Sequence, residues 1–249
     1  MKQSRLKKGG LIALITILSM VPPPSTDLYM PGLPEIVAYY QTTTSLASFT
    51  MTVFFIFMAI GTLILGPVSD KFGRKPVLIW STAATLVCSI VCAAAPSITF
   101  LICVRAIQAF GAGGMVAIGS ALVRDSFKGP EMGKVLSITQ ALLFIAPVAA
   151  PILGALILEV SNWRMTFVAL AVLNGITLAL VLLLEETLPK AERVRESALH
   201  SIFGLFKVAK NPVCGFALGQ RNFDGAFHGI HCRRLVCVCQ SISHVRNRL

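Results

Sequence analysis

Six long apolar runs separated by short polar segments dominate residues 11–184 of this 249-residue chain. Each run holds about 20 residues, which is the length that an α-helix needs to cross a bilayer at about 1.5 Å per residue. A short basic stretch with two glycines, residues 66–76, joins the second and third runs, and we expect a loop there that closes a helical hairpin. The runs predict six membrane-spanning helices, at about 11–30, 46–65, 77–95, 99–122, 135–158 and 165–184.

The composition indicates that the bilayer is the solvent of most of this chain. Hydrophobic residues make up 55% of the sequence and charged residues only 13%, where a soluble domain carries about 25% charged residues. The mean hydropathy is +0.77. We therefore expect an all-α integral membrane protein whose six-helix bundle covers residues 11–184, between a cytoplasmic amino terminus at 1–10 and a charged cytoplasmic linker at 185–211.

The placement of the positive charges predicts an orientation and excludes one class of partner. The net charge of +11 is typical of nucleic-acid-binding proteins, but the Lys and Arg residues lie in short clusters between apolar runs and form no continuous basic face. Ten of them lie in the amino terminus and in the segments after the second and fourth spans, whereas the opposite segments hold Arg164 alone. Cytoplasmic loops are rich in Lys and Arg, so both ends of the bundle are expected in the cytoplasm.

The sequence changes character in its last thirty residues, 220–249. Residues 211–218 begin like a seventh span, and the apolar run then stops. Residues 220–249 hold five Arg and no Lys, together with three of the four His and three of the seven Cys, in a spacing that fits no common zinc site. We interpret 212–249 as an aborted seventh span and an atypical basic tail that arose by truncation or a change of reading frame, which resequencing the gene would test. We expect no metal site.

Asp27 and Arg105 are the charged residues that lie well inside the predicted spans. An intramembrane charge is costly and usually marks a substrate or ion pathway, so both are candidates for binding a substrate or an ion. Gln108 lies three residues after Arg105 and shares its helix face. The alternatives are a structural ion pair between Asp27 and Arg105, and a position of Asp27 at the membrane interface.

Prolines and small residues mark several spans. Pro22, Pro23 and Pro24 predict a kink or local unwinding in the first span, and Pro147 and Pro151 predict kinks in the fifth. Small residues recur every four positions, a spacing that allows close approach of helices and is expected to serve mostly packing. They are Ala109, Gly113, Ala117 and Ala121 in the fourth span and Ala146, Ala150 and Gly154 in the fifth.

Several of these residues fall into patterns of a known family. The pattern Gly66, Asp70, Gly73, Arg74 and Lys75 resembles the signature between spans two and three of the major facilitator superfamily. The fourth-span pattern of that superfamily is similar to Arg105, Gln108, Gly111 and Gly113, and the fifth-span pattern of its drug–proton antiporters is similar to Pro147, Pro151 and Gly154. Residues 26–34 and 163–167 resemble segments of the Bcr/CflA drug-efflux subfamily.

The resemblance implies the amino-terminal half of a twelve-span transporter with drug and proton sites between its two halves. It implies proton-coupled export of small amphipathic drugs across the bacterial inner membrane, with the proton gradient as energy source, no cofactor and no enzymatic reaction. Asp27 and Arg105 would then take part in drug recognition and proton coupling, and Asp70, Arg74 and Lys75 in an inner gate. The alternative is a membrane half-domain without transport. A homodimer of halves is a further option, and the sequence does not name the drug.

Overall fold

The computed structural model describes residues 8–188, and these residues are helical with short connections. The expectations for the amino terminus before residue 8, and for the linker and the tail from residue 189 onward, lie outside the described residues. The elements are α1 (Lys8–Met20), α2 (Pro22–Asp27), the 3₁₀ turn η1 (Met30–Gly32), α3 (Leu33–Tyr40), α4 (Thr44–Phe72), α5 (Arg74–Ala93), α6 (Ile98–Ser126), α7 (Pro130–Val160) and α8 (Arg164–Leu183).

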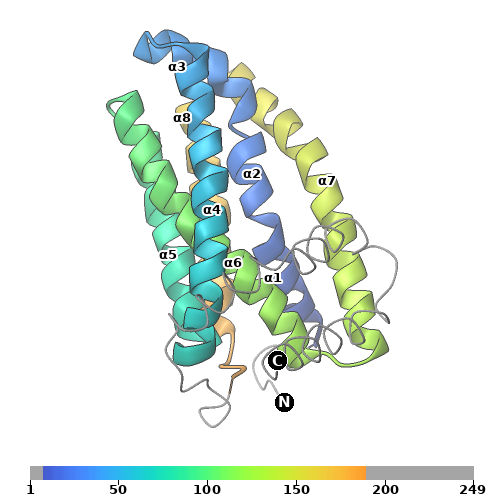
Figure 1. The fold of residues 1–249 in the computed structure, drawn as a ribbon. Coiled ribbons are helices and arrows are strands. Elements are labelled where there is room, and N and C mark those ends of the chain that lie inside the picture. Colours follow the sequence, from blue (N-terminus) through green and yellow to red (C-terminus); the bar gives the residue numbers. More distant parts are fainter. Residues whose placement is uncertain (1–7, 189–249) are drawn as a thin grey trace, which may run out of the picture. The chain divides into compact units, whose positions relative to one another are not determined.

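The predicted all-α six-span architecture is confirmed for the described part of the chain. Six helical stretches there are long and apolar enough to cross a membrane, and they match the six apolar runs in order. The first of them, Gly9–Tyr40, comprises α1, α2, η1 and α3. The chain therefore crosses the membrane once before α4, and α3 lies at the end of the bundle opposite to the start of α5 (Figure 1). We call these two ends the α3 end and the Arg74 end.

The first span is broken where the prolines predict it. Helix α1 stops at Met20 and α2 begins at Pro22, with Val21 between them. Proline is tolerated in a first helical turn because its missing N–H would have no partner there. The helical path then runs beyond the predicted end at residue 30, through η1 and α3, and stops at Gln41, which adopts a left-handed conformation with φ of 49°.

The predicted loop at residues 66–76 is wrong in its extent. Helix α4 continues to Phe72 and α5 starts at Arg74, so Gly73 is the single non-helical residue between them. Gly73 has φ of 110°, a conformation that side-chain-bearing residues rarely adopt, and this allows one residue to reverse the chain. Pro67 lies inside α4, and Pro76 lies in the first turn of α5, where a proline costs little.

Helix α6 forms the centre of the bundle. It packs closely against α4 and α5, α5 packs against α8, and α7 packs against the first span (Figure 1). Glycines permit the closest approach: a Cβ on Gly113 would overlap backbone atoms of Met58 and Thr62 in α4, and one on Gly61 would overlap the Phe110 carbonyl. Because these contacts are backbone to backbone, the two helices touch without intervening side chains.

Helices α4 and α7 leave broad apolar faces uncovered by the other described helices. Large exposed side chains lie along both helices, which suits contact with lipid or with another membrane domain. On α4 they include Phe49, Phe55, Ile56, Phe57, Ile60 and Leu63, and on α7 they include Phe144, Ile145, Val148, Ile152, Leu153 and Leu156.

Candidate functional site

The buried guanidinium of Arg105 is the centre of the candidate site. Arg105 lies in the α3-end half of α6 and is completely inaccessible to solvent. Its Nη2 donates a hydrogen bond of 2.9 Å to the carbonyl oxygen of Ser25 in α2. Its Nε and Nη1 have no hydrogen-bond partner among the described residues. One hydrogen bond therefore ties this cation to the first span.

Three aromatic rings surround the same guanidinium. The Arg105 Cζ lies 4.7 Å from the ring centroid of Tyr29, 4.9 Å from that of Phe54 and 5.6 Å from that of Phe167. Each ring presents a region of negative potential to a cation within about 6 Å. The rings come from the first span, α4 and α8, so four different membrane segments meet at this one charge.

Asp27 forms no ion pair with Arg105, although it lies on the same short helix as Ser25. It ends α2, is half-buried, and its Oδ1 accepts a hydrogen bond of 3.1 Å from the Thr26 hydroxyl. The Ser25 carbonyl that holds Arg105 is two residues away on the same short helix. The alternative of a structural Asp27–Arg105 ion pair is therefore wrong for this structure, because the guanidinium bonds to backbone instead.

Gln108 belongs to a second buried polar group, between α5, α6 and α8. Its Nε2 donates to the Ser89 hydroxyl at 2.8 Å, and Asn174 Nδ2 approaches the same oxygen at 3.4 Å and donates to the Leu170 carbonyl at 2.8 Å. The amide oxygens of Gln108 and Asn174 have no partner among the described residues. Sequence reasoning missed Ser89 and Asn174, although Asn174 is a carboxamide in the middle of an apolar run.

Arg74 joins several helix ends at the Arg74 end of the bundle. Its Nη1 lies 2.6 Å from Asp70 Oδ1 and donates to the Ser69 hydroxyl at 2.6 Å, while its Nε donates to Asp125 Oδ2 at 3.0 Å. Its backbone N–H donates to Glu186 Oε1 at 2.9 Å. One residue thus connects α4, α5, α6 and the segment after α8, and sequence reasoning missed Asp125 and Glu186 as its partners.

The remaining residues of the predicted gate lie around this connection. Lys75 Nζ donates to the Leu182 carbonyl of α8 at 3.1 Å. Gly73 supplies the reversal between α4 and α5, and Gly66 faces α6, where a Cβ would lie 3.8 Å from that of Ala117. Arg74 is the central residue of the group, and its neighbours hold the ends of α4, α5 and α8 in place.

The predicted small-residue positions lie at helix contacts. Gly111 faces α5, where a Cβ would crowd the Ser81 carbonyl, and Gly113 faces α4. Gly154 lies against the backbone of Leu28, between α2 and η1. Pro147 and Pro151 lie within α7, which is described as one continuous helix from Pro130 to Val160.

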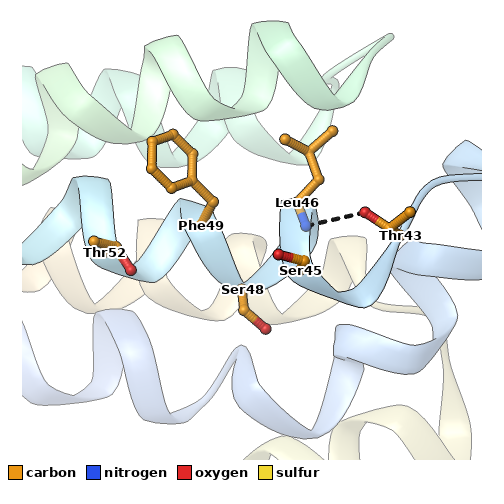
Figure 2. A pocket seen from close by; sticks show the side chains of 6 residues that line it. All are labelled: Thr43, Ser45, Leu46, Ser48, Phe49 and Thr52. Atoms are coloured by element: carbon orange, nitrogen blue, oxygen red, sulfur yellow. Dashed lines mark hydrogen bonds between the residues drawn. The ribbon is translucent and has the colours of Figure 1, made fainter.

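A groove at the α3 end of α4 lies apart from these residues. Figure 2 shows its lining, in which the Thr43 hydroxyl accepts a hydrogen bond of 3.3 Å from the Leu46 N–H and so caps the start of α4. None of the residues predicted for the site lines it, and the described residues contain no group of three His, Cys, Asp or Glu that could hold a metal ion. The groove is lined by Thr43, Ser45, Leu46, Ser48, Phe49 and Thr52.

Comparison with known proteins shows which family this chain resembles. The family model described as Major Facilitator Superfamily matches residues 13–227. The multidrug resistance protein MdtL of Escherichia fergusonii is 34% identical over 194 residues, which are 75% of this chain and 50% of MdtL. A bicyclomycin resistance protein homolog of Haemophilus influenzae is 31% identical over 191 residues, which are 76% of this chain and 48% of that protein.

The fold agrees with that of a solved transporter. The structure of the proton:xylose symporter XylE bound to 6-bromo-6-deoxy-D-glucose superposes with a TM-score of 0.66, at 14% identity, over 88% of this chain and 54% of XylE. The chain thus spans about half the length of the relatives it matches, and the match is to their amino-terminal half. This chain belongs to the Major Facilitator Superfamily, as a multi-pass membrane protein with the six-helix architecture of one transporter half.

Proposed function

We propose that this chain forms the amino-terminal half of a proton-coupled exporter of amphipathic drugs. Relatives named for multidrug and bicyclomycin resistance support the class of substrate. Transport by secondary carriers needs no covalent chemistry, and a proton gradient would supply the energy. The proposal places the protein in the cytoplasmic membrane of a bacterium, with small drugs, protons and membrane lipids as its partners.

The observation that carries the proposal is the buried Arg105 guanidinium. A charged side chain inside a membrane-spanning helix is costly, and such charges usually serve an ion or substrate pathway. Among residues 8–188 no carboxylate forms an ion pair with Arg105, and one hydrogen bond ties the guanidinium to the α2 backbone at Ser25, two residues from Asp27. In our proposal, protonation of Asp27 changes the electrostatic field at α2 and so alters how firmly Arg105 is held there. Gln108 would keep the Arg105 face of α6 in register with α5.

The orientation in the proposal follows from the two ends of the bundle. The Arg74 end carries positive charges near the ends of α4 and α6, at the start of α5 and in the connection after α6. They include Lys71, Arg124, Lys75 and Lys128. We propose that this end faces the cytoplasm, as does the amino terminus. The contacts of Arg74 with Asp70 and Asp125 would then form an inner gate, since they must part or move together when the helix ends separate.

Resistance measurements in an efflux-deficient bacterium test the proposal. We expect the full 249-residue chain to raise resistance to several amphipathic drugs, and a proton uncoupler to abolish the gain. Asp27→Asn and Arg105→Ala should each remove it, while Glu159→Gln, at an exposed position on α7, should keep it at equal membrane abundance. Absence of uncoupler-sensitive resistance would contradict export by this chain and favour a half-domain without transport. Full activity of both site variants would contradict the assigned roles.

The covering of the exposed α4 and α7 faces is part of the same test. In the proposal a second six-helix unit covers them and completes the drug site. Where this chain is expressed or purified alone, that unit is a second copy of it, so active preparations should contain crosslinked pairs of the chain. Activity in preparations without such pairs would contradict this covering.

A further inference from the structure

A row of aromatic rings connects the α3 end of the bundle to the buried Arg105. The Trp163 ring at the start of α8 lies 6.0 Å from Phe167, and Phe167 lies 5.4 Å from Tyr29, measured between ring centroids. Phe167 and Tyr29 are two of the rings that face the Arg105 guanidinium. We call Trp163, Phe167 and Tyr29 the aromatic ladder. All three side chains are buried, although Trp163 begins a helix at the end of the bundle.

A hydrogen bond to another helix fixes the Trp163 end of the ladder. Helix α8 has no side-chain cap of its own at Trp163. The exposed Glu35 of α3 caps the helix instead, because its Oε2 accepts a hydrogen bond of 3.0 Å from the Trp163 backbone N–H. A carboxylate at a helix amino terminus satisfies an unpaired N–H and is favoured by the helix dipole.

A second contact between the same helices involves the residue after Trp163. Arg164 Nη2 donates a hydrogen bond of 3.0 Å to the Tyr39 hydroxyl of α3. Its Cζ also lies 4.6 Å from the Tyr39 ring centroid and 4.9 Å from the Trp163 ring centroid. We call Glu35, Tyr39 and Arg164 the α3 clamp. Two independent polar contacts thus hold the first turn of α8 against α3.

The ladder links this first turn to the rings around Arg105. Trp163 and Phe167 are four residues apart and share one face of α8, so a rotation of the first turn moves both rings together. Tyr29 is held separately, by a hydrogen bond of 3.1 Å between its hydroxyl and that of Thr50. Within the described helices the guanidinium makes one hydrogen bond, so the three rings around it are its other close contacts there.

We propose that Glu35, Tyr39 and Arg164 are positioning residues for Arg105, acting through Trp163 and Phe167. If the clamp loosens, the first turn of α8 can shift and Phe167 moves away from the guanidinium. The three rings around Arg105 then no longer enclose it on the side of the α3 end. This inference concerns the geometry around Arg105, and it stands whether or not the chain alone exports a drug.

Tryptophan fluorescence of the purified full chain in nanodiscs tests the first link. The chain has two tryptophans, and Trp80 is 77% exposed, so Trp80→Phe leaves Trp163 as the sole reporter. In this background Glu35→Ala should shift the Trp163 emission to longer wavelength and raise its quenching by acrylamide. Glu35→Gln keeps a hydrogen-bond acceptor and should restore much of the original emission. Glu159→Ala, at the same end of α7, should leave the emission unchanged.

A double-mutant cycle tests the link to Arg105. Arg105→Met removes the charge at the far end of the ladder, with Arg105→Lys as a second variant in case the first does not fold. We expect each Arg105 variant to change the acrylamide quenching of Trp163. The change should be much smaller when Glu35→Ala is already present. Phe167→Leu should abolish this interdependence, since it interrupts the ladder.

Two results would overturn the inference. The clamp is excluded if Glu35→Ala and Arg164→Ala leave the emission and quenching of Trp163 as they were. The ladder is excluded if the effects of Glu35→Ala and Arg105→Met are additive with Phe167 intact, because independent effects mean that the two ends do not communicate. A merely structural role of Glu35 would lower thermal stability without producing the interdependence.

Discussion

The contact between Gly113 of α6 and α4 makes the sharpest stability prediction. A Cβ at residue 113 would overlap the Met58 carbonyl and lie 2.7 Å from the Thr62 backbone nitrogen. Both are backbone atoms of a helix, so no flexible side chain can move away. Overpacking of a tight interior costs about 1–3 kcal/mol, and the rigid partner places Gly113→Ala toward the upper part of that range.

Gly175 of α8 provides the matched control for this substitution. It lies inside a helix, and a Cβ there would meet no atom within 4 Å. In the absence of a clash, replacing a helical glycine by alanine stabilises a protein by about 0.4–1 kcal/mol. The same chemical change should therefore have opposite signs at the two positions.

Thermal unfolding in one detergent measures both variants. With a shift of about 2–4 °C per kcal/mol for a chain of this size, Gly113→Ala should lower the melting temperature by several degrees. Gly175→Ala should raise it slightly or leave it unchanged. If Gly113→Ala melts at or above the temperature of Gly175→Ala, the close α4–α6 approach described here is refuted.

Two further predictions concern the buried polar groups. Arg74→Ala leaves Asp70 and Asp125 without their cation and should destabilise the protein by about 1–3 kcal/mol. Arg124→Ala, at an exposed position, should have little effect on stability, and equal melting temperatures of the two variants would contradict the Arg74 connection. Replacing Gln108 alone by Leu removes one of the two amide donors to the Ser89 hydroxyl and leaves Asn174 as the other. The double variant with Asn174→Leu removes both donors, so in thermal unfolding it should lose more stability than the sum of the two single losses. Strict additivity of the two substitutions would show that the amides do not share the Ser89 hydroxyl.

The arrangement of the spans could be read from the sequence because hydrophobicity is a local property. Six runs of bilayer length predict six helices, and three consecutive prolines predict the break that the structure places at Val21. Small residues every four positions indicate tight helix contacts, and Gly113 and Gly154 indeed lie against neighbouring backbones. The predicted loop at residues 66–76 is wrong in its extent, because Gly73, with a positive φ, reverses the chain alone.

The partners of the candidate site residues could not be read from the sequence. Opposite charges at similar depth predict an Arg105–Asp27 ion pair as one alternative, but the guanidinium donates to the Ser25 carbonyl near the end of α2 instead. Glu35 and Trp163 are 128 positions apart, and their contact requires α3 to lie beside the start of α8. Such contacts depend on helix rotation and rotamers, which a single sequence does not determine.

The central claim, that Arg105 couples a proton gradient to drug movement, is tested most directly in proteoliposomes that contain only the purified chain. Vesicles with an acidic lumen should take up a fluorescent amphipathic cation from outside as protons leave, and the uptake should stop when the gradient is dissipated. Arg105→Lys should abolish it, because lysine lacks the planar guanidinium that lies between three rings and the Ser25 carbonyl. Uptake that ignores the gradient, or that persists unchanged in Arg105→Lys, would contradict the claim.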